Sequence, residues 1–172
     1  MIIHQISGFS NSGKTTIMTG LVSFLKKNGY RVGTIKHHGH SDPLVGEAKQ
    51  KDATKHREAG AEASIVSSAG GELQLIAHHM KEEFSLHQLI ALYIPFQFDI
   101  ILIEGFKKAE FPKTFVMRDT DDIEQLLEYP EVRAIICPEL ISHDNVATFS
   151  KNQLYSYYDW FLTEIAKDDK NE

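Results

Sequence analysis

The stretch from Gly8 to Thr15 constrains the fold of this chain more than any other part of it. It reads Gly-Phe-Ser-Asn-Ser-Gly-Lys-Thr, which fits the phosphate-binding loop pattern of a glycine, four residues, then glycine, lysine and serine or threonine. Residues 1–6 are mostly apolar, as in a buried strand, and the apolar residues within 17–25 recur at the spacing of one helix face. A glycine–serine turn that caps a helix would explain the loop alone. Strand, loop and helix together predict a nucleotide-binding protein.

The residues inside this loop have predicted roles that follow from their chemistry. Gly8 and Gly13 allow backbone angles, and a close approach of phosphate, that a side chain would block. The N–H groups between them, at Ser10, Asn11 and Ser12, are expected to point inward and cradle the β-phosphate beside the positive end of the following helix.

Two side chains at the end of the loop complete the predicted phosphate site. Lys14 is expected to reach the β- and γ-phosphate oxygens, and Thr15 to place its hydroxyl on Mg²⁺.

Composition narrows the class of protein. The chain has 172 residues, 42% of them hydrophobic and 24% charged, which predicts one soluble globular domain. With the loop of residues 8–15, we expect a single P-loop nucleotide-binding domain over residues 1–172. The net charge of −6 argues against a nucleic-acid binder, and the single cysteine, Cys137, fits a reducing cytoplasm. No apolar run approaches the roughly 20 residues that span a bilayer. A strand that starts within two residues of the N-terminus leaves no room for a signal peptide, so we expect a cytoplasmic protein without a membrane anchor.

The order of the predicted elements indicates an α/β fold. Strands are expected at 31–36, 63–68, 73–78, 98–103, 113–118 and, as the final core strand, 132–137, and helices at 50–60, 86–93 and near the C-terminus. Strands 63–68 and 73–78 are separated by a glycine turn only, which predicts an antiparallel hairpin. We therefore expect a three-layer P-loop NTPase fold with a mainly parallel sheet, helices on both faces and an added antiparallel hairpin.

A second informative residue, Glu104, follows the stretch 98–103, which ends in four consecutive apolar residues. A buried parallel strand that ends in a carboxylate delivers that acid to the carboxyl edge of the sheet. There it is expected to hold Mg²⁺ through water or to position a water molecule, and Gly105 permits a sharp turn beside the phosphates. The alternative is a strand-terminal glutamate that caps a loop.

Three histidines, His37, His38 and His40, follow the second strand. A transition-metal site would need correctly aimed ligands and usually a further donor from a distant part of the chain. Two other interpretations stay open, a solvated polar loop and contacts with phosphate or pterin groups.

Taken in order, these motifs resemble one known family, the molybdopterin-guanine dinucleotide biosynthesis protein B family. The segments that carry the resemblance, within residues 2 to 118, are Gly8–Thr16, Ile35–His37, Lys51–Asp52, Glu58–Ala61 and Ile103–Lys107. Glu-Gly-Phe-Lys after an apolar strand is more specific than the P-loop itself.

The resemblance implies a function, partners and site residues. It implies a GTP-binding protein with weak Mg²⁺-dependent GTPase activity that assists the nucleotidyltransferase joining GMP to molybdopterin, and it implies a homodimer. The loop Gly8–Thr15 would bind phosphates with Thr16 as a neighbouring hydroxyl, and Asp52 and Glu104 would lie near Mg²⁺ or the attacking water. Three further motif positions carry no assigned role: Lys36, His37 and Lys107.

One departure concerns guanine. Many GTPases read this base with Asn-Lys-x-Asp after a late strand, and this chain has no such motif. The corresponding place is Cys137-Pro138-Glu139, which makes Glu139 the candidate acceptor for guanine N1 and N2.

Two other functions remain as alternatives. A small-molecule kinase commonly closes a lid of several arginines over the phosphates, and no two of the four arginines here are close in sequence. An adaptor that carries GTP or molybdopterin without hydrolysis is not separated from a slow GTPase by sequence. In either case residues 73–78 are the predicted edge that pairs across subunits.

Overall fold

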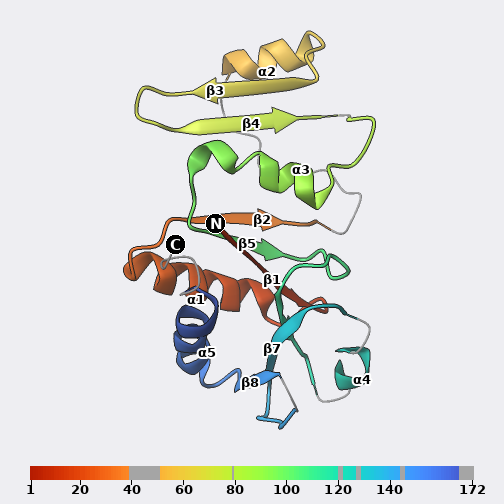
Figure 1. Cartoon of the computed structure of the whole chain (residues 1–172). Helices are drawn as coiled ribbons and strands as arrows, with labels where there is room; N and C mark the ends of the chain where they lie inside the picture. Colours follow the sequence, from red (N-terminus) through yellow and green to blue (C-terminus); the bar gives the residue numbers. More distant parts are fainter. Residues whose placement is uncertain (39–50, 79, 120–121, 127–128, 144–145, 167–172) are drawn as a thin grey trace. The chain divides into compact units, whose positions relative to one another are not determined.

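The computed structural model describes residues 1–38, 51–78, 80–119, 122–126, 129–143 and 146–166. In chain order the elements are β1 (Ile2–Gly8), α1 (Lys14–Lys27), β2 (Val32–Lys36), α2 (Lys51–Glu58), β3 (Ala63–Ser67), β4 (Leu73–Ala77), α3 (Leu86–Ala91), a 3₁₀ turn (Ile94–Phe96), β5 (Ile100–Glu104), β6 (Lys113–Val116), α4 (Ile123–Leu126), β7 (Val132–Cys137), β8 (Ala147–Ser150), α5 (Leu154–Trp160) and a π-helical turn (Phe161–Ile165) (Figure 1). They form two compact units, Met1–His40 with Leu86–Glu172, and Ser41–Ser85. The expectation of one domain over residues 1–172 stays a prediction.

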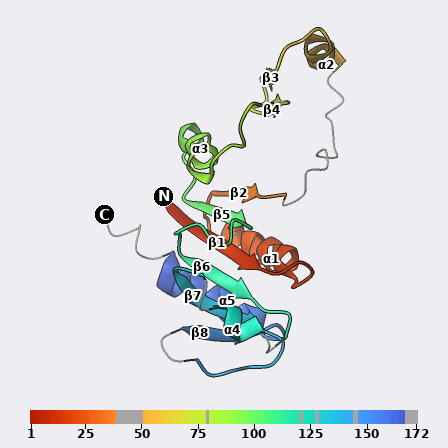
Figure 2. The same ribbon diagram turned by 90° about the vertical axis from the view of Figure 1, so that its right-hand side faces the viewer.

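The first unit is built on a six-stranded sheet. Its strand order is β2-β5-β1-β6-β7-β8, and all five neighbouring pairs are parallel (Figure 2). β1 lies between β5 and β6, with Ile6 opposite both Glu104 and Thr114. Every residue of β5 is buried, as expected for a parallel strand covered on both faces. The predicted parallel sheet is confirmed.

Helices cover both faces of this sheet, because successive residues of each strand point to opposite faces. Figure 1 shows α1 and α5 on one side of the sheet and α4 on the other. The core under α1 and α5 includes Ile6, Leu21, Leu25, Leu102, Ile136 and Phe161. The other face carries two clusters, one under α3 with Ile90, Ile101 and Ile103, and one under α4 with Phe115, Leu126 and Ile135. The predicted three layers are confirmed.

One strand was not expected. Residues 132–137 were predicted to be the final core strand, but β8 follows and pairs in parallel with β7, Ile135 opposite Thr148. All four residues of β8 are half-buried and only one is a large apolar residue, so the sequence carries no buried run there. The correction adds one edge strand and leaves the fold class unchanged.

The second unit contains α2 and the hairpin of β3 and β4. The two strands are antiparallel with Ile65 opposite Leu75, and Gly71 in the turn has φ 83°. The hairpin is a two-stranded sheet of its own. Arg57 of α2 donates a hydrogen bond of 2.6 Å to the Ser64 hydroxyl of β3, which ties the helix to the hairpin. The predicted hairpin is confirmed.

Among the helices that the structure describes, none is both long and apolar enough to cross a membrane.

Candidate functional site

The predicted phosphate loop connects the end of β1 to the start of α1. Gly8 has φ 145°, and a Cβ there would lie 2.3 Å from the carbonyl oxygen of Val116 on β6, so only glycine fits. Gly13, with φ 93°, immediately precedes α1, whose first turn has neither a side-chain cap nor an acidic residue. The first N–H groups of α1 are therefore available to an anion, with the positive end of the helix behind them.

The side chains of Thr15 and Glu104 meet beside this loop. The Thr15 hydroxyl donates to the Glu104 carboxylate, 3.0 Å from Oε1 and 3.2 Å from Oε2. The ammonium of Lys36 at the end of β2 lies 3.3 Å from Oε1, and the carboxylate is mostly buried. The three residues come from α1, β5 and β2, so the parallel sheet brings them together at its carboxyl edge.

The residues present suit a magnesium ion bound together with phosphates. Mg²⁺ is usually held by one or two protein oxygens, with waters and phosphate oxygens completing its shell. Thr15 and Glu104 supply a hydroxyl and a carboxylate at one point. Within the described ranges no three histidine, cysteine or acidic side chains form a metal cluster, and His40 lies outside those ranges.

Lys14, the first residue of α1, points back over the loop. Its ammonium donates a hydrogen bond to the carbonyl oxygen of Phe9. Burial lowers the pKa of Lys14, the Glu104 carboxylate opposes this effect, and the charges of Lys107 and Lys36 lower the pKa further. The cationic side chains of three segments therefore interact at this place.

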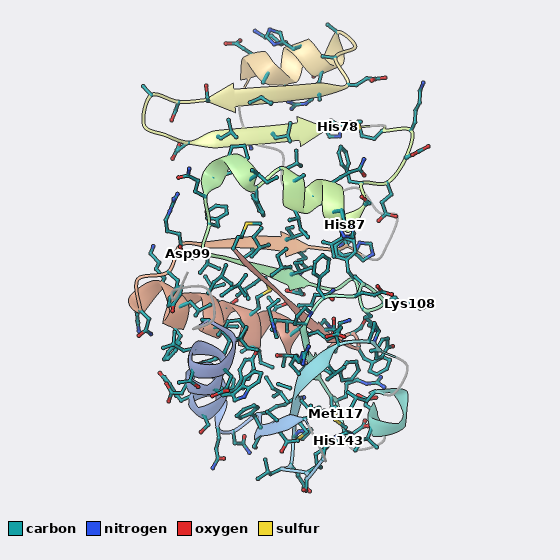
Figure 3. All side chains as sticks on the ribbon, in the orientation of Figure 1. His78, His87, Asp99, Lys108, Met117 and His143 are labelled. Carbon is teal, nitrogen blue, oxygen red and sulfur yellow. The ribbon has the colours of Figure 1, made fainter. Side chains whose placement is uncertain are left out.

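The loop forms one wall of a cleft of about 940 Å³, a size that suits a nucleotide. The other walls are residues 36–38 and 104–109. Its described lining has four lysines, at 14, 36, 107 and 108, and one carboxylate, Glu104. Figure 3 shows Lys108 and Asp99 at opposite ends of β5, which places this cleft at the carboxyl edge. A cationic cleft in a chain of net charge −6 indicates an anion-binding site.

The turn after Glu104 is held by two polar residues of β1 that sequence reasoning missed. Gly105 and Phe106 both have positive φ, 101° and 50°. The Gln5 amide donates to the carbonyl oxygens of Gly105, at 3.1 Å, and Phe106, at 2.9 Å, and the Ser7 hydroxyl donates to Gly105 at 3.3 Å. Gln5 is fully buried, so polar residues in an otherwise apolar strand were the available signal.

Phe9 also carries contacts that sequence reasoning missed. The Lys107 ammonium lies 4.2 Å from the centre of the Phe9 ring, and the Arg118 guanidinium carbon lies 4.5 Å from it, both at cation–π distances. Asp122 binds Arg118 at 2.8 Å and also accepts its backbone N–H at 2.7 Å. Phe9 thus links the phosphate loop to the segments after β5 and β6.

Known proteins share the sequence that builds this cleft. The family model of molybdopterin guanine dinucleotide synthesis protein B matches residues 3–138. The chain belongs to this family. A Bacillus subtilis relative, "Probable molybdopterin-guanine dinucleotide biosynthesis adapter protein", is 39% identical over 124 residues, 72% of this chain and 69% of the relative. The adapter protein of Escherichia coli is 34% identical over 113 residues, 66% of this chain and 63% of that protein.

Solved structures of the same family share the fold over nearly the whole chain. Bacillus subtilis MobB superposes with a TM-score of 0.78 at 32% identity, covering 96% of this chain and 98% of that one. A MobB homologue from Bacillus stearothermophilus gives 0.75 at 31% identity with the same coverage. The family match reaches from β1 to the residue after β7, and so includes both the loop and Glu104.

Most of the remaining predicted site residues of the phosphate loop and the following histidine segment line the cleft. Ser10, Asn11 and Thr16 line the cleft, as do the histidines His37 and His38. Ser12 is 1% exposed, and its hydroxyl has no hydrogen-bond partner among the described residues.

Two predicted acidic residues are not brought to this lining. Glu139 is exposed beyond the end of β7 and is not among the residues that line the cleft. Asp52 lies on α2 in the second unit, where its carboxylate is 3.5 Å from the Lys55 ammonium. Guanine reading by Glu139 and a part for Asp52 near Mg²⁺ both stay predictions.

Proposed function

We propose that this chain is an adapter protein in molybdopterin guanine dinucleotide synthesis whose cleft binds GTP together with Mg²⁺. Family membership and the names of the relatives support the pathway. The contact of the Thr15 hydroxyl with the Glu104 carboxylate, 3.0 Å apart beside Lys14, is the observation that carries the nucleotide part. A loop that cradles phosphate, a lysine and two oxygen ligands are the parts that phosphoryl chemistry needs.

Each side chain would take a defined part when GTP binds. The Lys14 ammonium leaves the Phe9 carbonyl oxygen for the β- and γ-phosphate oxygens, which are stronger acceptors. Thr15 and Glu104 would hold Mg²⁺, which would supply positive charge to the same phosphates. Lys36, already 3.3 Å from Glu104, would hold that carboxylate in place through their ion pair.

The same arrangement supports slow hydrolysis of GTP. Water would attack the γ-phosphate in line, with Glu104 as the acidic residue near the ion or the water and Lys14 stabilising the developing charge. The described lining of the cleft contains no arginine. Because an arginine finger is worth about 10³–10⁵ in rate, turnover without a partner should be slow.

The proposed partners follow from the pathway. They are the nucleotidyltransferase that joins GMP to molybdopterin, molybdopterin itself and a second copy of the chain. The hairpin supports self-association, since Ile65, Leu73 and Leu75 are 65%, 52% and 47% exposed.

Reconstituted cofactor synthesis tests this function. Attachment of GMP to molybdopterin by the nucleotidyltransferase would be followed with and without the chain, using wild type and Lys14→Ala. Lys27→Ala, at the other end of α1, is the control with the same change of charge. We expect wild type and Lys27→Ala to raise the yield, and Lys14→Ala to fail. Equal yields with and without wild type would reject the adapter role.

A further inference from the structure

Lys107 is one of the four lysines that line the cleft. It lies three residues after Glu104, beyond the turn that Gln5 and Ser7 hold, and it lines the cleft. Its side chain is half-buried, and its ammonium rests over the Phe9 ring at 4.2 Å from the ring centre. A turn fixed by three hydrogen bonds therefore sets where this ammonium is presented.

Phe9 marks the end of the loop where the terminal phosphate would lie. The Lys14 ammonium is bonded to the Phe9 carbonyl oxygen, and a P-loop lysine serves the β- and γ-phosphates. The ammonium groups of Lys14 and Lys107 therefore both contact Phe9. Lys14 donates to its backbone carbonyl oxygen, and Lys107 lies over its ring. Glu104 and Thr15, which would hold Mg²⁺, line the same cleft, and the ion would supply positive charge to the phosphates there.

The cations around Phe9 are held close together although they repel one another. Asp122 fixes Arg118 beside the same ring, so Arg118 cannot move away from Lys107 without losing that pair. Burial, and after it the charge of Arg118, lowers the pKa of Lys107, while Asp122 opposes the shift. A bound anion relieves this repulsion, and a more highly charged anion relieves it more.

We propose that Lys107 is a second ammonium for the terminal phosphate of a bound nucleoside triphosphate, held ready on the Phe9 ring. It lets the cleft distinguish a triphosphate from a diphosphate. This inference rests on the proposed function, since it assumes that the cleft binds a nucleotide. The proposal also explains the contact with the Phe9 ring. An aromatic face can hold the Lys107 ammonium and release it to a phosphate without leaving a buried hydrogen-bond donor unpaired.

The test compares two affinities in each variant by calorimetry, one for a non-hydrolysable GTP analogue and one for GDP, both with Mg²⁺. Lys107→Met keeps the length and the apolar stem but removes the charge, and Lys27→Met removes an equal charge at the far end of α1. We expect the triphosphate preference to fall about tenfold in Lys107→Met, the size of a lost charged hydrogen bond, and to survive in Lys27→Met. Lys107→Arg should keep most of the preference. A purely structural role would lower both affinities equally.

Two outcomes would overturn the inference in different ways. If wild type prefers the triphosphate and Lys107→Met keeps that preference, the role of Lys107 is wrong while the proposed function stands. If wild type binds neither nucleotide, the proposed function is wrong and the inference fails with it. Phe9→Leu gives a second reading, since it keeps an apolar contact for Phe115 but removes the aromatic face. An unchanged preference there would reject the ring as the holder of Lys107.

Discussion

The Glu104 carboxylate contacts side chains from two other elements that line the cleft. It accepts from the Thr15 hydroxyl, pairs with Lys36 and raises the pKa of Lys14, which burial lowers. Its backbone carbonyl also accepts the N–H of His37, so it joins the segment after β2 to the sheet. One residue thereby fixes the relative places of three strand and helix ends.

Replacing the Glu104 carboxylate by an amide tests its predicted part in Mg²⁺ binding separately from its part in stability. In Glu104→Gln the amide keeps a hydrogen-bond acceptor for Thr15 but loses the negative charge that would attract Mg²⁺. We expect the gain in GTP affinity on adding Mg²⁺ to fall about tenfold or more, from loss of one charged contact, with little change in the urea unfolding midpoint. Glu72→Gln, an exposed residue next to the hairpin turn, is the matched control. Full Mg²⁺ dependence in Glu104→Gln would remove this residue from the metal site.

At the scale of elements, β1 serves the core and the site with alternate residues. Its apolar residue Ile6 packs under α1, while Gln5 and Ser7 hold the turn after β5. Its remaining polar residue, His4, is fully buried and bonds Thr114 of β6 at 2.9 Å, and Thr114 bonds the Tyr157 hydroxyl of α5 at 2.9 Å. This chain of hydrogen bonds joins β1, β6 and α5.

The buried histidine predicts a dependence of stability on pH. Burial, with help from the charges of Lys113 and Arg133, lowers the pKa of His4 from 6.5 to about 3. Between these values the unfolded chain binds the proton and the folded chain does not, so stability falls as pH drops below 6.5.

A variant without a titrating group isolates this effect. We expect the difference in unfolding free energy between wild type and His4→Gln to shift against wild type by about 1 kcal/mol from pH 6.5 to pH 5.5, because the unfolded histidine is half protonated at the start of this interval. Urea unfolding at the two pH values measures it. A difference that does not change with pH would show that His4 titrates normally in the fold.

Elements that a continuous stretch of sequence specifies could be predicted, and contacts between distant residues could not. The loop of residues 8–15 and the apolar strand before Glu104 are continuous patterns, and both lie where the sequence places them. The hydrogen bond from Gln5 to the Phe106 carbonyl oxygen joins residues 101 positions apart, and the cation–π contact joins Arg118 to Phe9. No local sequence pattern contains either contact. β8 was missed because it is only four residues long and Phe149 is its single large apolar residue.

At the scale of the whole molecule, the chain has one unit for the cleft and one that carries the hairpin. Every described residue that lines the cleft belongs to the first unit. The second has exposed apolar residues on its strands, including Ile65 and Leu75, which lie opposite each other. A two-stranded sheet also has unpaired edges, and both features favour association with a second copy.

Light scattering tests this proposal with one pair of variants. Leu75→Glu places a charge on the exposed hairpin, and we expect it to shift the chain from dimer to monomer. Leu140→Glu is the control, since Leu140 is 65% exposed but belongs to the first unit. A dimer that withstands Leu75→Glu, or a wild-type monomer, would exclude the hairpin interface.

The central claim is that the cleft binds GTP with Mg²⁺, and a calorimetric titration with GTP and with ATP tests it most directly. Wild type should bind GTP with clear preference, and Lys14→Ala should lose about tenfold or more in affinity because a charged contact with phosphate is gone. Such a preference would make Glu139 the next residue to replace. Preference for ATP, or no binding of GTP in the presence of Mg²⁺, would contradict the account.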